Sequence, residues 1–222
     1  LWQNINMKKI LALLILSPLT YSYNNLQIHL NSPIDRTGPK NECRDDICTS
    51  LLNLIDNAQS SIDFAVYGLR GQPQILNALI QAEKRGVFIR GIIDKTVDGK
   101  SYYTDTYLLE QKLNNIRSDH EADLRTKAYL KRKNIKDNSE CKRPNFTDGP
   151  LQCFENKGYA SKEKIFFTGD IMHNKFFVVD KRFIWTGSAN LSDTGTGGYN
   201  ANIVAELDSV YFAKFYTQEF EQ

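Results

Sequence analysis

The stretch "SIDFAVYGLRGQPQILNALIQAEKRGVFIRGIID", residues 61–94, decides the fold class of this chain. Its two apolar runs, at 62–67 and 87–94, are predicted strands, and the apolar spacing between them is helical. Pro73 suits the first turn of that helix, and Gly86 suits the position just after its end. A strand, a helix and a strand within roughly thirty residues form a βαβ unit, which predicts parallel pairing of the two strands.

Further elements extend this unit in both directions. Helical spacing covers residues 49–58 and begins again near Thr104. Later in the chain, "KFFVVD" and "RFIWTG" are predicted strands joined by a tight turn that opens at Asp180, and "NIVAEL" is another strand. The chain ends in a predicted helix with four aromatic residues on one face: Phe212, Phe215, Tyr216 and Phe220. We therefore predict an α/β fold with a mixed, largely parallel β-sheet flanked by helices.

The composition is that of an ordinary globular protein. The chain has 222 residues, of which 41% are hydrophobic and 24% charged. This length allows one large α/β domain or two small ones. The net charge of +2 is too small to indicate a partner.

The N-terminal segment is typical of a secretory signal peptide. Lys8 and Lys9 precede a short apolar run at 10–16 and an exit of small or polar residues. A membrane anchor is the alternative, but spanning a bilayer takes about 20 apolar residues. We expect a leader within residues 1–22, a folded domain at 23–222, and a secreted or periplasmic protein. The residues before Met7 resemble sequence upstream of the true start.

The four cysteines form two close pairs. In an oxidising compartment such pairs predict the disulfides Cys43–Cys48 and Cys141–Cys153. A four-cysteine zinc site is the alternative, but the gaps do not match the usual two-residue spacing of zinc knuckles.

Residues 121–160 are polar and show no long apolar period, which indicates an insert pinned by the second cysteine pair. Eight lysines and arginines stand against two acidic residues in 125–143, a local net charge of +6. A solvated loop and a surface that follows a phosphate backbone are both compatible with this charge.

The stretch "IMHNKFFVVDKRFIWTGSANLSDTG", residues 171–195, carries the chemistry. His173 and Lys175 point to the same side of a strand entrance, because side chains alternate along a strand. Ser188 and Asn190 have the same spacing after the next strand, where Gly187 leaves room for a ligand near the backbone. An imidazole, a cation, a hydroxyl and a carboxamide suit attack on a tetrahedral phosphorus centre. No acidic cluster accompanies them, so we expect neither a metal nor another cofactor.

The spacing His173-x-Lys175-x-x-x-x-Asp180, followed by Gly187-Ser188-x-Asn190, resembles the HKD signature of the phospholipase D superfamily. That superfamily includes phospholipases, cardiolipin synthases and small metal-independent endonucleases. The likeness covers most of residues 49–94 and 165–222, since the βαβ segment also resembles the family's opening segment.

The resemblance implies a metal-independent phosphodiesterase with a two-step mechanism. His173 would attack phosphorus and form a phosphohistidine, while a second, protonated histidine gives its proton to the leaving oxygen. Lys175, Ser188 and Asn190 would stabilise the phosphate oxygens. Asp180 would either orient the site or serve only the turn that it opens.

One departure from the family concerns the residue that orients the catalytic histidine. Some family nucleases carry a glutamate shortly after the signature, and Ala201 takes that place here. Asn200, Asn202 or Glu206 are the possible substitutes, and the sequence leaves the choice open.

The second histidine must come from another signature, because neither His29 nor His120 has a lysine two residues later. A homodimer with two copies of His173 in one cleft would supply it. So would a second signature half, if this chain were the N-terminal half of a longer protein. Nucleic acid is the leading substrate. The alternatives are phospholipid headgroups, hydrolysed in lipid degradation, and a catalytically silent module that only binds phosphate.

Overall fold

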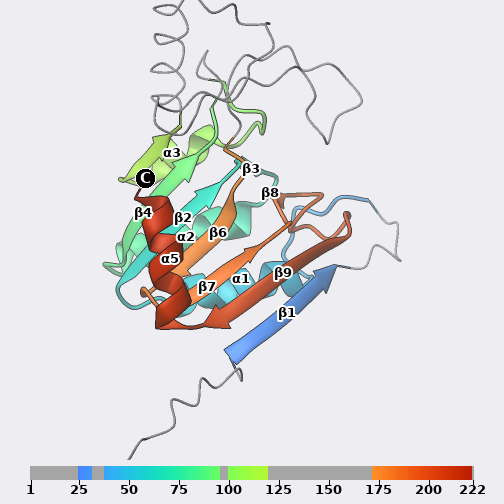
Figure 1. Ribbon diagram of the computed structural model, residues 1–222. Helices are drawn as coiled ribbons and strands as arrows, with labels where there is room; N and C mark the ends of the chain where they lie inside the picture. The colour runs from blue at the N-terminus through green and yellow to red at the C-terminus, as the bar shows by residue number, and fades with distance from the viewer. Residues whose placement is uncertain (1–24, 32–37, 96–99, 120–171, 222) are drawn as a thin grey trace, which may run out of the picture.

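A computed structural model describes residues 25–31, 38–95, 100–119 and 172–221 of the chain. The strands are β1 Leu26–Asn31, β2 Ser61–Val66, β3 Leu69–Arg70, β4 Phe88–Ile93, β5 Ile116–Ser118, β6 Lys175–Val179, β7 Phe183–Gly187, β8 Leu191–Ser192 and β9 Asn202–Asp208. Within the described ranges, seven of them form one sheet in the order β1-β9-β7-β6-β2-β4-β5 (Figure 1). The other two, β3 and β8, pair in a small second sheet.

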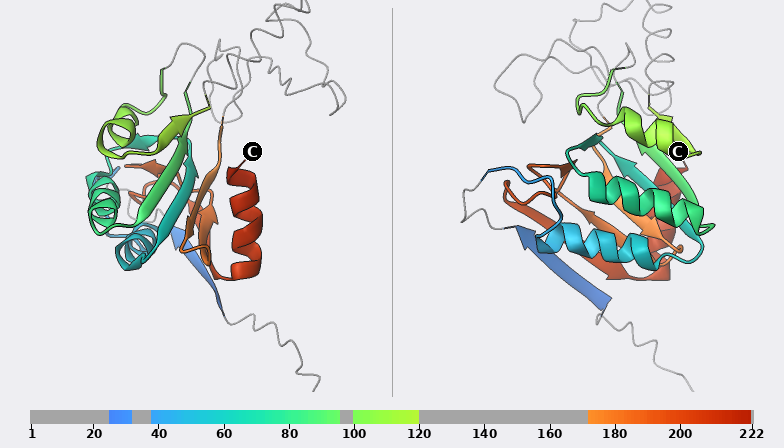
Figure 2. Two further views of the ribbon diagram at one scale, coloured as in Figure 1. Left: turned by 90° about the vertical axis from the view of Figure 1, so that its left-hand side faces the viewer. Right: turned by 180° about the vertical axis from the view of Figure 1, so that it is seen from behind.

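Helices cover both faces of the large sheet. They are α1 Asp46–Asn57, α2 Pro73–Lys84, α3 Tyr107–Lys112 and α5 Val210–Phe220. Figure 2 shows α1, α2 and α3 on one face and α5 alone on the other. The predicted α/β class, with a mixed sheet flanked by helices, is confirmed.

Parallel pairing is less extensive than the sequence suggests. In the described sheet it joins β2 to β4 and β4 to β5, whereas the other four neighbouring pairs are antiparallel. The reason is topological. The βαβ unit produces parallel pairing, but a tight hairpin such as β6–β7 can only be antiparallel.

Local sequence signals fix the ends of these elements. Pro73 lies in the first turn of α2, and Gly86, with a φ of +94°, follows the helix in a left-handed conformation. The β6–β7 turn has two central residues with positive φ, Asp180 at 53° and Lys181 at 54°. Both are the central residues of a turn that the N–H of Arg182 closes by donating to the backbone oxygen of Val179 at 3.0 Å, and this tight turn aligns the two strands that carry the signature.

The main core lies between the sheet and helices α1 to α3. Trp185 is fully buried there, and its indole N–H donates to Ser50 Oγ at 3.1 Å. Phe177 stacks on Phe64 with ring centroids 5.2 Å apart. The middle of β6 is therefore enclosed by the core, so a ligand can reach the strand only near its ends.

The core under α5 is smaller than the aromatic content of that helix predicts. Tyr216 and Phe220 pack against the sheet as expected, but Phe212 and Phe215 are 47% and 49% exposed. A helix that covers the sheet alone buries only one stripe, and the predicted apolar face is wider than that stripe.

Other exposed apolar side chains lie on the same face of the sheet as α5. On β1, His29 is buried toward α1, so the alternating side chains of Leu26, Ile28 and Leu30 point to the α5 side. The pairing places Leu30 opposite Ile203 on β9. The six exposed residues of this surface, named the apolar face below, are Leu26, Ile28, Leu30, Ile203, Phe212 and Phe215.

The predicted bridge Cys43–Cys48 is present, with Cα atoms 5.1 Å apart, and it confirms the first cysteine pair as a disulfide. The leader at 1–22, His120, the insert at 121–160 and the pair Cys141–Cys153 lie outside the described residues. Among the described helices, none combines the length and apolar character needed to cross a membrane.

Candidate functional site

The signature residues gather at one edge of the large sheet. The antiparallel pairings bring the start of β6, the end of β7 and the start of β9 to the edge where the parallel strands β2 and β4 end. His173 and Lys175 therefore meet Tyr67, which follows β2, and Asp94, which follows β4. Open carboxyl ends of parallel strands are a common place for ligand sites.

His173 presents an accessible, neutral imidazole. It is an exposed residue, and its ring meets the Tyr67 ring edge-on with centroids 5.0 Å apart. Partial burial lowers the pKa of His173 below its ordinary value, and the charge of Lys175 lowers it further. A neutral imidazole is the form that can attack phosphorus.

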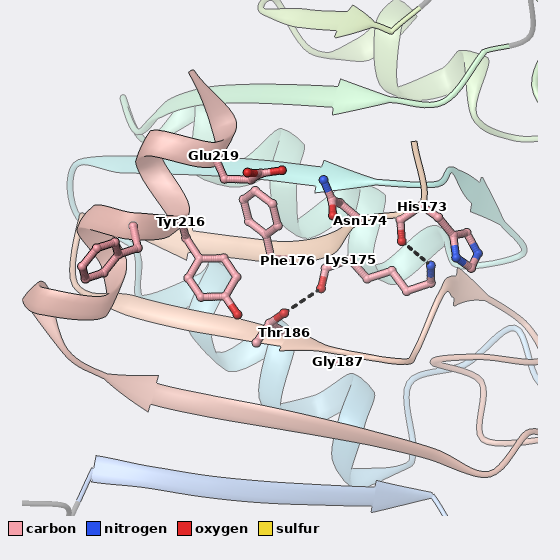
Figure 3. Close-up of a pocket in the computed structure, with 9 residues that line it drawn as sticks. His173, Asn174, Lys175, Phe176, Thr186, Gly187, Tyr216 and Glu219 are labelled. Atoms are coloured by element: carbon pink, nitrogen blue, oxygen red, sulfur yellow. Dashed lines mark hydrogen bonds between the residues drawn. The ribbon is translucent and has the colours of Figure 1, made fainter. Parts of the chain in front are cut away.

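Lys175 is the buried cation of the site. It is only 8% exposed, and its ammonium donates to the backbone oxygen of His173 at 2.8 Å (Figure 3). Burial lowers the pKa of Lys175 to about 8, although the nearby carboxylate of Asp94 acts in the opposite direction. The ammonium is thus charged at neutral pH and titrates just above it.

Asp94 is a site residue that the sequence reasoning missed. Its carboxylate is 4% exposed and accepts the backbone N–H of Met172 at 2.8 Å, directly before His173. It therefore anchors the segment that presents the histidine. The signal that identifies it is its place at the end of the parallel strand β4, which is separated from β6 only by β2.

Ser188 lies at the same edge, after β7. Its hydroxyl donates to Asn202 Oδ1 at 2.9 Å and accepts the N–H of Ile203 at 3.0 Å. Asn190 Oδ1 is buried and has no hydrogen-bond partner among the described residues. A Cβ at Gly187 would lie 2.7 Å from Val204 Cα, so glycine is needed here for close packing against β9.

Asp180 is not brought into the site. It lies past the far end of β6, seven residues from His173, which at the strand rise of ~3.3 Å per residue is roughly 20 Å away. Its carboxylate accepts the backbone N–H groups of Gln59, Ser60 and Ser61 at 2.7–3.2 Å. Burial alone would raise the pKa of Asp180, but these hydrogen bonds outweigh it and lower the pKa. This geometry favours the structural alternative for Asp180.

Among the substitutes for the family glutamate, Asn202 is the one that contacts a signature residue, through Ser188. Glu206 lies 3.3 Å from the Nε2 atom of His29, on the strand pair β1–β9. His29 itself is buried between Glu206 and Asp46, away from the signature residues.

A pocket of about 400 Å³ adjoins the signature on the α5 side of the sheet (Figure 3). Thr186 donates to the backbone oxygen of Lys175 at 3.3 Å in its wall, and Tyr216 stands opposite from α5. Phe215 also lines the pocket, so the apolar face begins at the edge of the site. Among the described residues, no group of three histidine, cysteine or acidic side chains is placed to hold a metal ion.

Comparisons with known proteins agree with this geometry. The family described as cardiolipin synthase, PLD-like domain, matches residues 51–222. The comparison with curated proteins finds no match.

Two solved structures share the fold. Nuc from Salmonella typhimurium, a phospholipase D family member, is 18% identical with a TM-score of 0.51, and the match covers 88% of this chain and 91% of that one. NucT from Helicobacter pylori is 15% identical with a TM-score of 0.52, and the match covers 88% and 94% of the two chains.

Proposed function

This chain belongs to the phospholipase D-like domain family, and we propose that it hydrolyses phosphodiester bonds of nucleic acid through a phosphohistidine intermediate. One observation carries the proposal. An exposed imidazole with a lowered pKa stands two residues from a buried ammonium at an open sheet edge. This pair combines a nucleophile with a fixed charge for the phosphate oxygens.

The proposed reaction has two steps. A ring nitrogen of His173 forms a bond to phosphorus, and the bond to the leaving oxygen breaks as that oxygen takes a proton from a second histidine. A water molecule then attacks the phosphohistidine, gives its proton to the second histidine and releases His173. Lys175 and Asn190 carry N–H groups that suit the phosphate oxygens, and the Ser188 hydroxyl is held at the same sheet edge by Asn202.

The second histidine needs a second signature. In the described part of the chain the other histidine is His29, which is 7% exposed and held by two carboxylates. A second copy of this chain would bring a second His173, and the two would titrate as a coupled pair. The apolar face next to the site supports such a partner, because large exposed apolar patches mark interaction surfaces.

Phospholipid headgroups are the second candidate substrate. The same apolar face would suit a lipid surface, and the name of the matching family refers to a lipid-forming enzyme. Nucleic acid is favoured by the charge of +6 within 125–143. That segment lies outside the described residues, so its part in binding rests on the sequence alone.

A substrate panel tests the proposal. Single-stranded and duplex DNA, RNA and phosphatidylcholine vesicles would be incubated with the protein in excess EDTA. Hydrolysis of nucleic acid in EDTA is expected, and His173→Ala should abolish it without lowering the unfolding temperature, because His173 is exposed.

Activity that disappears with chelation but survives His173→Ala would place the chemistry elsewhere. Hydrolysis of the vesicles alone would replace nucleic acid by lipid. Binding of phosphate without turnover of any substrate would favour the silent module.

A further inference from the structure

Three tyrosine rings continue from the site toward solvent; Tyr67, Tyr102 and Tyr103 are named the tyrosine cluster here. Tyr67 contacts the His173 ring at 5.0 Å, and its own ring lies 5.8 Å from that of Tyr102 and 5.4 Å from that of Tyr103. The Tyr102 ring therefore lies within 10.8 Å of the imidazole, centroid to centroid. A base reaches that far from a phosphate bound at His173, since only one sugar separates them.

The members of the cluster differ in exposure. Tyr103 is 7% exposed and packs as a core residue, whereas Tyr102 is 64% exposed. A large aromatic side chain with so much free surface beside a catalytic histidine offers a π-face to whatever the histidine binds.

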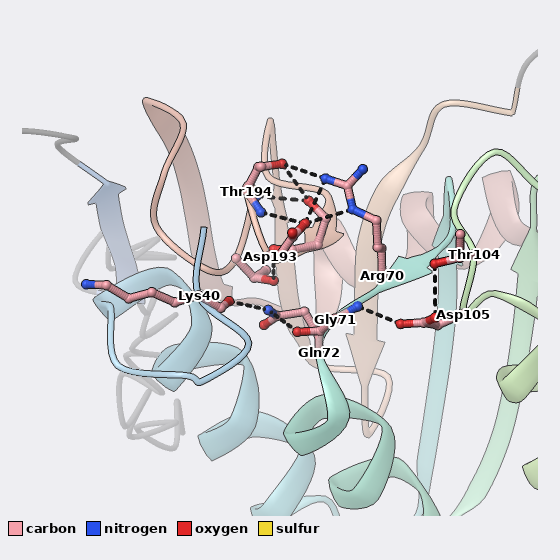
Figure 4. Close-up of polar contacts among 11 residues, drawn as sticks. Lys40, Arg70, Gly71, Gln72, Thr104, Asp105, Asp193 and Thr194 are labelled. Atoms are coloured by element: carbon pink, nitrogen blue, oxygen red, sulfur yellow. Dashed lines mark hydrogen bonds and ion pairs between the residues drawn. The ribbon is translucent and has the colours of Figure 1, made fainter. Parts of the chain in front are cut away.

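The loop that carries Tyr102 is fixed to the small sheet. The Asp105 carboxylate accepts the N–H of Gly71 at 2.7 Å, and the Asp105 N–H donates to the backbone oxygen of Leu69 at 3.0 Å. Arg70 stacks over the Tyr103 ring at 4.9 Å. Arg70 is itself held by Asp193 at 2.7 Å, as Figure 4 shows. A rigid ring loses little conformational entropy when it binds, which favours stacking.

We propose that Tyr102 stacks on the base next to the scissile phosphate and thereby makes unpaired nucleotides the preferred substrate. The inference rests on the proposed nucleic-acid hydrolysis and adds the specificity-determining residue and the strand state to it. Neighbouring base pairs cover both faces of a base inside a duplex, whereas an unpaired base exposes a face to an aromatic ring.

The test removes the ring and the base in turn. The substrate is a single-stranded DNA oligonucleotide with one cleavable phosphodiester, its other linkages being methylphosphonates. Each nucleotide flanking the cleavable linkage is either normal or a stable abasic analogue. Wild type should lose roughly 5- to 150-fold in kcat/KM when the stacked base is missing, which corresponds to the range that alanine substitutions of stacking aromatics give.

Tyr102→Ala should lose a similar factor on the normal substrate and little more on the abasic one, because either change removes the same contact. Tyr102→Trp keeps a stacking surface and should retain the preference for the normal substrate. Tyr107→Ala is the matched control: Tyr107 is 50% exposed on α3, outside the cluster, and its loss should not alter the preference. Thermal unfolding checks that each variant is folded.

The inference is overturned if the loss caused by Tyr102→Ala and the loss caused by the abasic substrate simply add. It is also overturned if wild type cleaves duplex DNA as fast as single strands. Either result leaves the proposed hydrolysis intact. Failure of wild type to cleave any oligonucleotide would instead refute the nucleic-acid function itself, and the inference with it.

Discussion

At the scale of single residues, the site is arranged by burial more than by direct pairing. His173 stays accessible while Lys175, two residues later on the same side of the strand, is almost fully enclosed. Burial favours the neutral form of both bases, so it lowers the pKa of each. Lys175 remains charged at neutral pH because its lowered pKa still lies above 7.

The titration of Lys175 predicts the alkaline side of the pH profile. Below pH 8 the ammonium is charged and can stabilise phosphate oxygens, and as the pH rises through about 8 this charge is lost. We expect kcat/KM for a model diester to fall tenfold per pH unit on that side. A profile that stays flat to pH 10 would contradict the assignment.

Asp94 should set the position of that alkaline limb. Its charge raises the pKa of Lys175, so Asp94→Asn should move the limb to lower pH. It should also lower the rate, because the anchor for the Met172 N–H is weakened. A merely structural role would lower the rate without moving the limb, so the full pH profile of the variant is the measurement.

Asp180 should contribute to stability and not to chemistry. Removing a carboxylate that accepts several hydrogen bonds costs about 2 kcal/mol or more of unfolding free energy, so Asp180→Ala should lower it by that order. Its folded pKa is lowered, so the stabilisation is present above the unfolded pKa near 4 and is lost as pH falls below it. The variant should therefore unfold more easily at pH 7, while the two proteins should differ less at pH 2–3.

Denaturant titration at both pH values, with kcat/KM per folded molecule, measures the effect. A large loss of kcat/KM in the folded variant would restore the orienting role for Asp180.

At the scale of elements, a buried carboxylate and Arg90 connect the end of α5 to the sheet. Asp63 on β2 is 2% exposed and accepts two hydrogen bonds from Arg90 on β4, at 2.7 and 2.8 Å. Arg90 also reaches Glu221 just after α5 at 2.7 Å and lies over the Phe220 ring. The guanidinium thus ties the helix end to two parallel strands.

Breaking this pair should weaken the protein more than a typical surface change. Asp63→Ala leaves Arg90 partly buried with one acidic partner, and we expect a loss of about 3 kcal/mol in unfolding free energy. Glu221→Ala is the matched control: Glu221 is 55% exposed, and its loss should cost under about 1 kcal/mol. Equal effects of the two changes would contradict the role assigned to the buried pair.

The elements that the sequence predicts are those with a long period and end signals. The βαβ unit around α2 has both, with Pro73 and Gly86 at the helix ends. The two-residue strands β3 and β8 are too short to show any period, and β1 is an edge strand whose apolar side faces solvent.

The residues of the candidate site also fall into those that the sequence predicts and those that it does not. His173, Lys175, Ser188 and Asn190 are recognised by their spacing along the chain. Asp94 and Tyr102 become visible only when the sheet brings distant segments to one edge.

At the scale of the whole molecule, the apolar face and the need for a second histidine both favour a partner. The pocket beside His173 is lined by Phe215, a member of that face. A partner that covers the face would thus lie against the site, where a second histidine is needed. Burial of apolar surface is the main favourable contribution to most protein association, so six exposed apolar side chains favour a partner on this face.

We expect the active species to be a dimer that uses this face. Sedimentation should give a dimer, and activity per chain should fall when the protein is diluted below the dissociation constant. Replacing Phe212 and Ile28 together by serine should shift the protein toward monomer and reduce activity in proportion, because both belong to the apolar face and neither lines the pocket beside His173. Val210→Ser is the matched control, because Val210 is 66% exposed but lines a different groove of α5, beside Lys181, and its loss should leave the dimer intact. A fully active monomer would mean that one signature suffices, and an inactive monomer would mean that the second signature comes from another polypeptide segment.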